Sequence, residues 1–246
     1  MHILVIDGGH VEAEFREKFG PAHTYRFFSY SEFMPDGNIA RAEKKFDELL
    51  QAADVVFDFN ENSFVGQPSK YDLPIFVYRS GFSIAEIVKT SKDANNYGEE
   101  SSEYEEVKAA IFGFCGLPTL LNRHLLEVSL YDEADRTKLA ETCAALGTDY
   151  RVVADRVGLV TPRVICQIIN EACFTVQEGT ATMADVDLGM KLGTSYPHGP
   201  FAWANAIGVE RVYAVLEAMW HDTRDERYKV CPLLKRQALR GEPFAV

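Results

Sequence analysis

No stretch of this sequence is apolar for long enough to cross a membrane, since none approaches the roughly 18 uninterrupted apolar residues that a spanning helix needs. The start of the chain also lacks the basic segment and the apolar run of a secretory signal, because Met1 to Ile6 is followed at once by Asp7. We therefore expect a cytoplasmic protein with no membrane partner.

Basic residues are comparatively few. The 25 Lys and Arg stand against 37 Asp and Glu, which gives a formal net charge of -12. A chain with this balance repels nucleic acids at long range, so we expect no nucleic-acid partner. The five cysteines are scattered without a C-x-x-C pair, a pattern that indicates neither a disulfide framework nor a metal site. A Walker-type G-x-x-x-x-G-K-[ST] motif for a mononucleotide is also absent.

The chain divides into two parts at about Asp155. Before it, short β-rich runs alternate with helical stretches such as 39–53 and 135–146, which is typical of βαβ units in a parallel sheet. The strands predicted are 3–6, 24–28, 55–59, 75–78, 109–112 and 150–154. The acidic stretch 92–106, with its Ser, Asn and Gly, is typical of disorder.

After Asp155 the apolar period becomes helical. One stripe recurs at steps of three and four residues: Val160, Val164, Ile165, Ile168, Ile169, Ala172, Cys173 and Val176. Thr182 followed by Asp185 predicts a capping-box helix start, and Gly193 predicts the end of that helix. A second apolar face, either a core or a dimer seam, is predicted at Ile207, Val212, Tyr213, Val215, Leu216, Met219 and Trp220.

Several motifs of the second part follow one another in a specific order. They are Asn170-Glu171-Ala172, Glu178-Gly179, Asp185-Val186-Asp187, Met190-Lys191-Leu192-Gly193, Tyr196-Pro197 and Gly199-Pro200-Phe201. In this order they resemble the C-terminal domain of 3-hydroxyacyl-CoA dehydrogenases, and a fainter likeness extends back over most of the chain. The resemblance implies an NAD-dependent oxidoreductase of fatty-acid metabolism, acting on a short-chain acyl-CoA of the 3-hydroxybutyryl type, and a homodimer formed through the helical domain.

The same resemblance nominates substrate residues in the helical domain. Tyr196, Gly199, Pro200 and Phe201 would border an acyl or pantetheine chain. The alternative for Phe201 is that it only anchors the next helix.

The first strand and turn depart from the family at the cofactor site. A dinucleotide fold needs G-x-G-x-x-G, whose glycines let the backbone approach the pyrophosphate at a helix N-terminus. Here the three glycine positions carry Asp7, Gly9 and Glu12, so two carboxylates stand where an anion would lie. Gly8 and Gly9 are the candidate NAD-binding residues, and the alternative is that they form only a tight turn. We expect NAD binding to be impaired.

The catalytic positions are also only partly kept. In the family a histidine is the acid and base, a glutamate orients it, and a serine and an asparagine hold the substrate oxygen. This chain keeps Ser80 and Glu127 but has Phe114 at the histidine position and Pro162 at the asparagine position. The alternatives are a turn or cap role for Ser80 and a solvated strand position for Glu127. His124 is a possible replacement base, though a surface histidine without chemistry is the simpler interpretation.

The fold expected is a reduced Rossmann-like α/β domain at 1–155 joined to an all-α helical domain at 156–246, which holds the acyl-CoA cleft and the dimer surface. Two functions follow. One is a 3-hydroxyacyl-CoA dehydrogenase with doubtful activity, and the other is a non-catalytic acyl-CoA-binding or scaffold protein of the same family.

Overall fold

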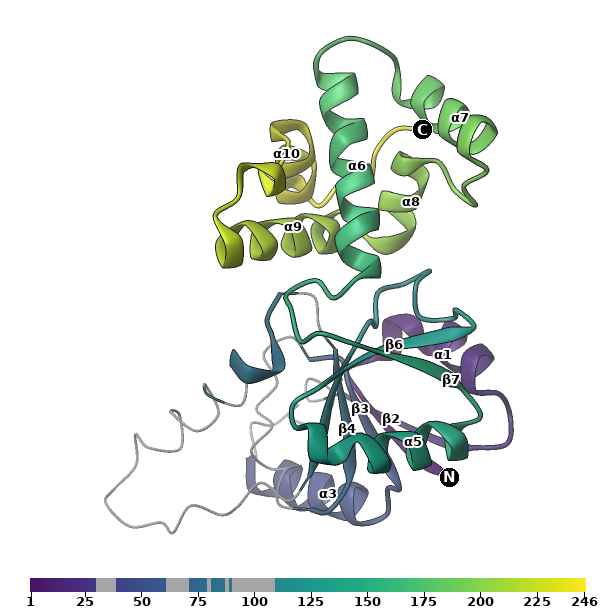
Figure 1. The fold of residues 1–246 in the computed structure, drawn as a ribbon. Helices are drawn as coiled ribbons and strands as arrows, with labels where there is room; N and C mark the ends of the chain where they lie inside the picture. The colour runs from purple at the N-terminus through teal and green to yellow at the C-terminus, as the bar shows by residue number, and fades with distance from the viewer. Residues whose placement is uncertain (30–38, 61–70, 79–80, 87–88, 90–108) are drawn as a thin grey trace.

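The computed structural model describes residues 1–29, 39–60, 71–78, 81–86, 89 and 109–246. A sheet flanked by helices forms the N-terminal part, and a bundle of helices stands on one end of that sheet (Figure 1). This is the expected reduced Rossmann-like domain joined to an all-helical domain. The disorder predicted at 92–106 lies outside the described residues.

The sheet has seven strands in the order β2-β1-β3-β4-β5-β6-β7. All neighbours are parallel except β5 and β6. The strands are β1 (His2–Ile6), β2 (Thr24–Phe28), β3 (Val55–Asp58), β4 (Pro74–Tyr78), β5 (Ala110–Phe114), β6 (Leu125–Leu130) and β7 (Asp149–Val153). The six predicted strands are therefore confirmed, with ends shifted by at most two residues. Strands β3, β4 and β5 are buried along their whole length, which explains their continuous apolar sequences.

Helices cover both faces of the sheet. They are α1 (Glu12–Phe19), α3 (Ile39–Gln51) and α5 (Arg136–Leu146), with the short 3-10 turns η1 (Gly9–Val11) and η3 (Glu133–Asp135). Phe15 and Phe19 of α1 pack with Phe57 in one core, while Phe46 and Leu50 of α3 pack in the other. The alternation of side chains along each strand places these two cores on opposite faces.

The bundle consists of α6 (Thr161–Gln177), α7 (Met183–Thr194), α8 (Pro200–Ile207), α9 (Val209–Thr223), the turn η4 (Glu226–Tyr228) and α10 (Pro232–Arg240). None of the helices in the described ranges is long and apolar enough to span a membrane. The stripe predicted on α6 is partly wrong, because Val160 and Val164 are exposed while Cys166 and Ile169 are buried. On α9 the predicted face is core, since its buried residues are Val209, Val212, Val215, Leu216 and Met219.

Helix α7 begins as predicted and ends two residues later than predicted. The Thr182 hydroxyl accepts from the Asp185 backbone N–H, and the Asp185 carboxylate accepts from the Thr182 N–H, which is a complete capping box. The prediction that Gly193 stops the helix is wrong. The helix runs through Gly193 to Thr194, and Ser195 takes the left-handed conformation with φ 57°.

Helix α8 begins against a buried carboxylate. Asp187 of α7 accepts backbone hydrogen bonds from Phe201 at 2.7 Å and Ala202 at 2.9 Å, so it caps α8 from the side. A Cβ atom on Gly199 would lie 2.3 Å from the Asp187 Cγ, a distance no side chain tolerates. Gly199 is therefore the residue that allows the two helices to meet.

Two glycine substitutions test the steric role of Gly199. Gly199→Ala forces Asp187 away from the N-terminus of α8, and we expect it to lower the free energy of unfolding by about 2 kcal/mol or more. Gly193→Ala is the matched control, because a Cβ there meets no atom within 4 Å and alanine favours the helix. It should raise stability by about 0.5–1 kcal/mol. Urea denaturation of both variants measures the difference, and equal effects would contradict the steric role of Gly199.

Candidate functional site

Three aromatic rings fill the carboxyl edge of the parallel strands, which is where ligands bind in open α/β sheets. Phe59 follows β3, Tyr78 ends β4 and Phe114 ends β5. The Phe59 ring centroid lies 5.2 Å from that of Phe114 and 6.1 Å from that of Tyr78. All three side chains are almost fully buried. We call Phe59, Tyr78 and Phe114 the aromatic plug.

Two glycines leave room for the aromatic plug. A Cβ on Gly8 would lie 2.8 Å from the Phe59 ring, and one on Gly116 would lie 2.7 Å from Phe59 and 2.9 Å from Tyr78. Gly8 therefore makes a close approach to an aromatic side chain. Gly9, in contrast, has no atom within 4 Å of its Cβ position and faces open space.

The turn between β1 and α1 differs from a phosphate-binding loop. Asp7 adopts φ 51°, and its side chain accepts from the Asn60 amide at 3.3 Å. The 3-10 turn η1 then intervenes, and α1 starts at Glu12, whose carboxylate pairs with Arg16 at 2.8 Å. With the plug behind the turn and carboxylates beside it, the residues of this edge do not fit the pyrophosphate of NAD.

A further carboxylate fixes the loop that follows β5. Glu14 of α1 accepts backbone hydrogen bonds from Thr119 at 2.9 Å, Leu121 at 3.0 Å and Asn122 at 2.8 Å. The Trp203 indole of α8 donates to the Thr119 hydroxyl at 2.9 Å. This loop is thus held by both parts of the molecule. Sequence reasoning missed Glu14, because its partners lie more than 100 positions away and no local pattern marks the contact.

Glu127 caps a helix. Its carboxylate accepts backbone hydrogen bonds from Val160 and from Thr161, the latter at 3.0 and 3.2 Å, at the first turn of α6. Val128 pairs with Phe114 in the sheet, so Glu127 points to the opposite face from Phe114. The structure therefore does not bring these two positions together. Pro162 is buried in the same first turn of α6.

The remaining candidates are spread over the molecule. Ser80 lies outside the described residues. The side chain of His124 is 88% exposed, and its nearest carboxylate partner is Asp149 at 3.5 Å. The His198 ring lies on the surface against Trp203, with centroids 5.8 Å apart.

The substrate candidates of the helical domain lie mostly inside it. Phe201 has no exposed surface and makes an edge-to-face contact with Phe244 near the C-terminus, with ring centroids 5.0 Å apart. Pro200 and Gly199 are also buried, and Tyr196 is half-buried against Trp203. In these positions Phe201 anchors α8, and its ring does not line an open cleft.

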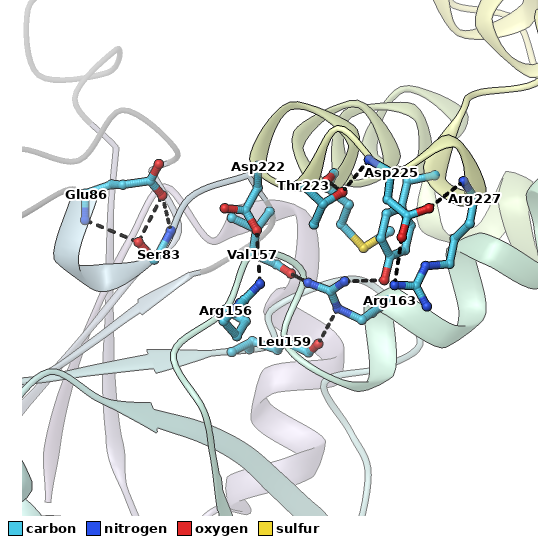
Figure 2. Close-up of polar contacts among 12 residues, drawn as sticks. Ser83, Glu86, Arg156, Val157, Leu159, Arg163, Asp222, Thr223, Asp225 and Arg227 are labelled. Atoms are coloured by element: carbon cyan, nitrogen blue, oxygen red, sulfur yellow. Dashed lines mark hydrogen bonds and ion pairs between the residues drawn. The ribbon is translucent and has the colours of Figure 1, made fainter.

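Among the described residues, a cleft of about 430 Å³ opens between the sheet domain and α9. Tyr78, Phe82 and Glu86 line it from the sheet side, and residues of α9 line the other side. Beside it, Arg163 at the start of α6 donates to the Val157 carbonyl at 2.6 Å, within the network in Figure 2. This bond ties α6 to the segment that joins the two domains.

Neither metal chemistry nor thiol chemistry is supported here. Within the described ranges no three His, Cys, Asp or Glu side chains are grouped to hold a metal ion. All five cysteines are buried free thiols. Burial raises the pKa of Cys115 and of Cys143 to about 12, so both remain neutral near pH 7.

Comparison with known proteins connects this geometry to a family. The family model described as "3-hydroxyacyl-CoA dehydrogenase, C-terminal domain" matches residues 158–243, which are the helical bundle. Residues 158–243 therefore match the C-terminal domain of the 3-hydroxyacyl-CoA dehydrogenase family. This match confirms the resemblance that the motifs from Asn170 to Phe201 indicated.

Individual relatives agree with the assignment. The chain is 41% identical over 87 residues to 3-hydroxyadipyl-CoA dehydrogenase of Escherichia coli, covering 35% of this chain and 18% of that protein. It is 31% identical over 110 residues to 3-hydroxybutyryl-CoA dehydrogenase of Bradyrhizobium diazoefficiens, covering 45% and 38%. The chain thus spans well under two thirds of the curated relatives it matches.

A solved structure extends the likeness to the whole fold. The crystal structure of (S)-3-hydroxybutyryl-CoA dehydrogenase from Ralstonia eutropha aligns with a TM-score of 0.66 and 20% identity, covering 98% of this chain and 94% of that one. At this identity the likeness concerns the fold.

The capping role of Glu127 is testable. Glu127→Ala removes the acceptor of the α6 backbone N–H groups, and we expect the free energy of unfolding to fall by about 1–2 kcal/mol. Glu127→Gln keeps an acceptor oxygen and should lose less. The exposed Glu141 of α5 supplies the control Glu141→Ala, which should change stability by less than about 0.5 kcal/mol. Chemical denaturation gives the three values, and a silent Glu127→Ala variant would refute the cap.

Proposed function

We propose that this chain is a non-catalytic member of the 3-hydroxyacyl-CoA dehydrogenase family, which binds a small ligand between its domains and self-associates through its helical bundle. The observation that carries the proposal is the aromatic plug. Its three rings fill the edge of the sheet that a nicotinamide cofactor needs. A Cβ on Gly8 would collide with Val5 and Phe59, and one on Gly116 would collide with Phe59 and Tyr78.

The chemistry of the catalytic positions supports the same proposal. Oxidation of a 3-hydroxyl requires a titratable base within hydrogen-bond reach of the proton that leaves. Phe114 carries no such group and lies fully buried among other rings. Glu127, the one retained acid among the described candidates, is already engaged by the backbone of α6.

A second candidate is favoured by family membership itself. It is a short-chain 3-hydroxybutyryl-CoA dehydrogenase of fatty-acid metabolism, which binds acyl-CoA and NAD through this chain. Such an enzyme needs a base at another position, because Phe114 has no titratable group. It also needs the rings of the aromatic plug to move apart. We keep cytoplasmic localisation and the division into 1–155 and 156–246 as part of either proposal.

Nucleotide binding and turnover separate the two candidates. We expect calorimetric titration with NADH to show no binding at concentrations that saturate an active 3-hydroxybutyryl-CoA dehydrogenase run alongside as a positive control. With acetoacetyl-CoA added, the nicotinamide absorbance should stay constant, because neither a cofactor site nor a base is in place. Oxidation of NADH at a rate proportional to the amount of chain would overturn the non-catalytic proposal and establish the second candidate.

Exposed apolar side chains on α7 support self-association. Helix α7 exposes Leu188 and Leu192, one turn apart, with 57% and 76% of each residue accessible. Two apolar side chains in this arrangement suit the surface of a second copy.

Charge placed on α7 tests the dimer. We expect the chain to scatter light as twice the 27.6 kDa of one copy, and Leu192→Glu to shift it to the single mass. Leu239→Glu on α10 is the control, since Leu239 is 71% exposed on a different helix and its substitution should leave the dimer intact. A native chain that scatters as a monomer, or two variants that behave alike, would contradict a dimer through α7.

A further inference from the structure

Two strands lie at the margins of the sheet. Among the described residues, β2 pairs only with β1, and β7 pairs only with β6. The outward N–H and C=O groups of an edge strand can pair with a strand of another molecule unless charges, proline or a bulge prevent it. The two edges of this sheet differ in what they present to a second copy of the chain.

Strand β7 is regular along its whole length. Its five residues pair with β6 in one unbroken register, and neither proline nor glycine interrupts them. The side chains alternate, so Tyr150 and Val152 pack against the core, whereas Asp149 and Arg151 are exposed on the other face. The free edge of β7 is therefore suited to accept a further strand.

The spacing of the charges on β7 is self-complementary. In an antiparallel pair of two β7 strands centred on Tyr150, Asp149 of each copy lies opposite Arg151 of the other, and the two Tyr150 side chains lie opposite each other. Opposite charges and aromatic rings directly across two strands both stabilise the pairing. Charges on an edge strand normally keep copies apart. This order of charges favours the pair instead.

Both charged groups are available for such a pair. Arg151 has no ion pair within the described ranges, and its neighbour across the sheet, Glu127, is already engaged by the backbone of α6. Asp149 lies 3.5 Å from His124, but the two side chains are 71% and 88% exposed, so this contact is weak. Pairing with a second copy therefore breaks no strong contact of either charged group.

The opposite edge of the sheet lacks this property. Arg26 is the one charged residue of β2. An antiparallel pair of β2 strands centred on Arg26 would place the two like charges opposite each other, and a pair centred on Tyr25 would place Arg26 opposite Thr24. Neither arrangement gives a pair of opposite charges, so β7 is the edge that suits a second copy.

We infer that β7 is a binding surface for a second copy of the chain, which adds its own β7 in antiparallel orientation and continues the sheet across both molecules. This contact is separate from the one proposed for α7 and does not depend on it. Five residues on each side make few hydrogen bonds, so we expect a dissociation constant of about 0.1–1 mM. At about 10 µM little of the β7 pair forms, and the α7 contact determines the mass.

Charge reversal on β7 tests the inference in the Leu192→Glu chain, where α7 does not contribute. In sedimentation equilibrium at about 1 mM, we expect this parent chain to associate. Arg151→Asp and Asp149→Arg each place like charges opposite each other, and each should weaken the association about tenfold or more. Arg26→Asp is the matched control, because it makes the same change of charge on β2 and should have no effect.

A mixture of the two β7 variants gives the sharper result. One variant carries only acidic groups at positions 149 and 151 and the other only basic groups, so pairing between the two is attractive. We expect the equimolar mixture to associate at about 1 mM, although each variant alone does not. A mixture that stays monomeric, or reversals that weaken association no more than Arg26→Asp does, overturns the inference. A Leu192→Glu chain that stays monomeric at about 1 mM also overturns it.

Hydrogen–deuterium exchange of the Leu192→Glu chain locates the contact without a substitution in β7. The outward amides of β7 should exchange more slowly at about 1 mM than at about 10 µM, because they gain an acceptor in the second copy. The amides of β2 should exchange equally at both concentrations. If β7 gains no protection at the higher concentration, the inference is wrong, whatever the reversed variants do.

Discussion

The packing of the Phe59 ring just after β3 determines the structure of the carboxyl edge of the sheet. Its contacts with Tyr78 and Phe114 join the ends of three neighbouring strands into one buried cluster. Gly8 and Gly116 are restricted to glycine because the ring passes so close to both. An edge that is normally open to a ligand has become part of the core, and the cleft between the sheet and α9 borders this edge at Tyr78.

Carboxylates that accept hydrogen bonds from backbone N–H groups recur in several parts of the structure. Glu127 caps α6, Asp185 accepts from the Thr182 N–H at the start of α7, Asp187 caps α8, and Glu14 holds the loop after β5. Each puts negative charge where peptide N–H groups leave a partial positive charge. Some of the carboxylates behind the negative net charge of the chain therefore stabilise its fold.

The sequence predicted the parts of the fold that depend on local pattern. Strands β3 to β5 were recognisable because burial on both faces makes them continuously apolar, and the capping box at Thr182 is a local motif. The motifs from Asn170 to Phe201 identified the family. The assignment of Phe114 and Pro162 to the histidine and asparagine positions of the family stays a prediction.

Contacts between distant segments could not be predicted in the same way. Gly8 was interpreted as a cofactor or turn residue because its neighbour in space, Phe59, lies 51 positions away. Gly193 was assigned as a helix end because glycine commonly ends helices, whereas the helix runs through Gly193 to Thr194. The cleft itself combines residues from β4 to α9, and no single segment carries its pattern.

The contact between Glu127 and the start of α6 has a mechanical consequence. It connects the last part of the sheet to the longest helix of the bundle. The Glu127 contact joins the sheet to the bundle, whereas the Arg163 bond is local to the first turn of α6 and the segment before it. Any separation of β6 from the start of α6 therefore has to break the hydrogen bonds that the Glu127 carboxylate accepts from the α6 backbone, and it leaves those N–H groups without their acceptor.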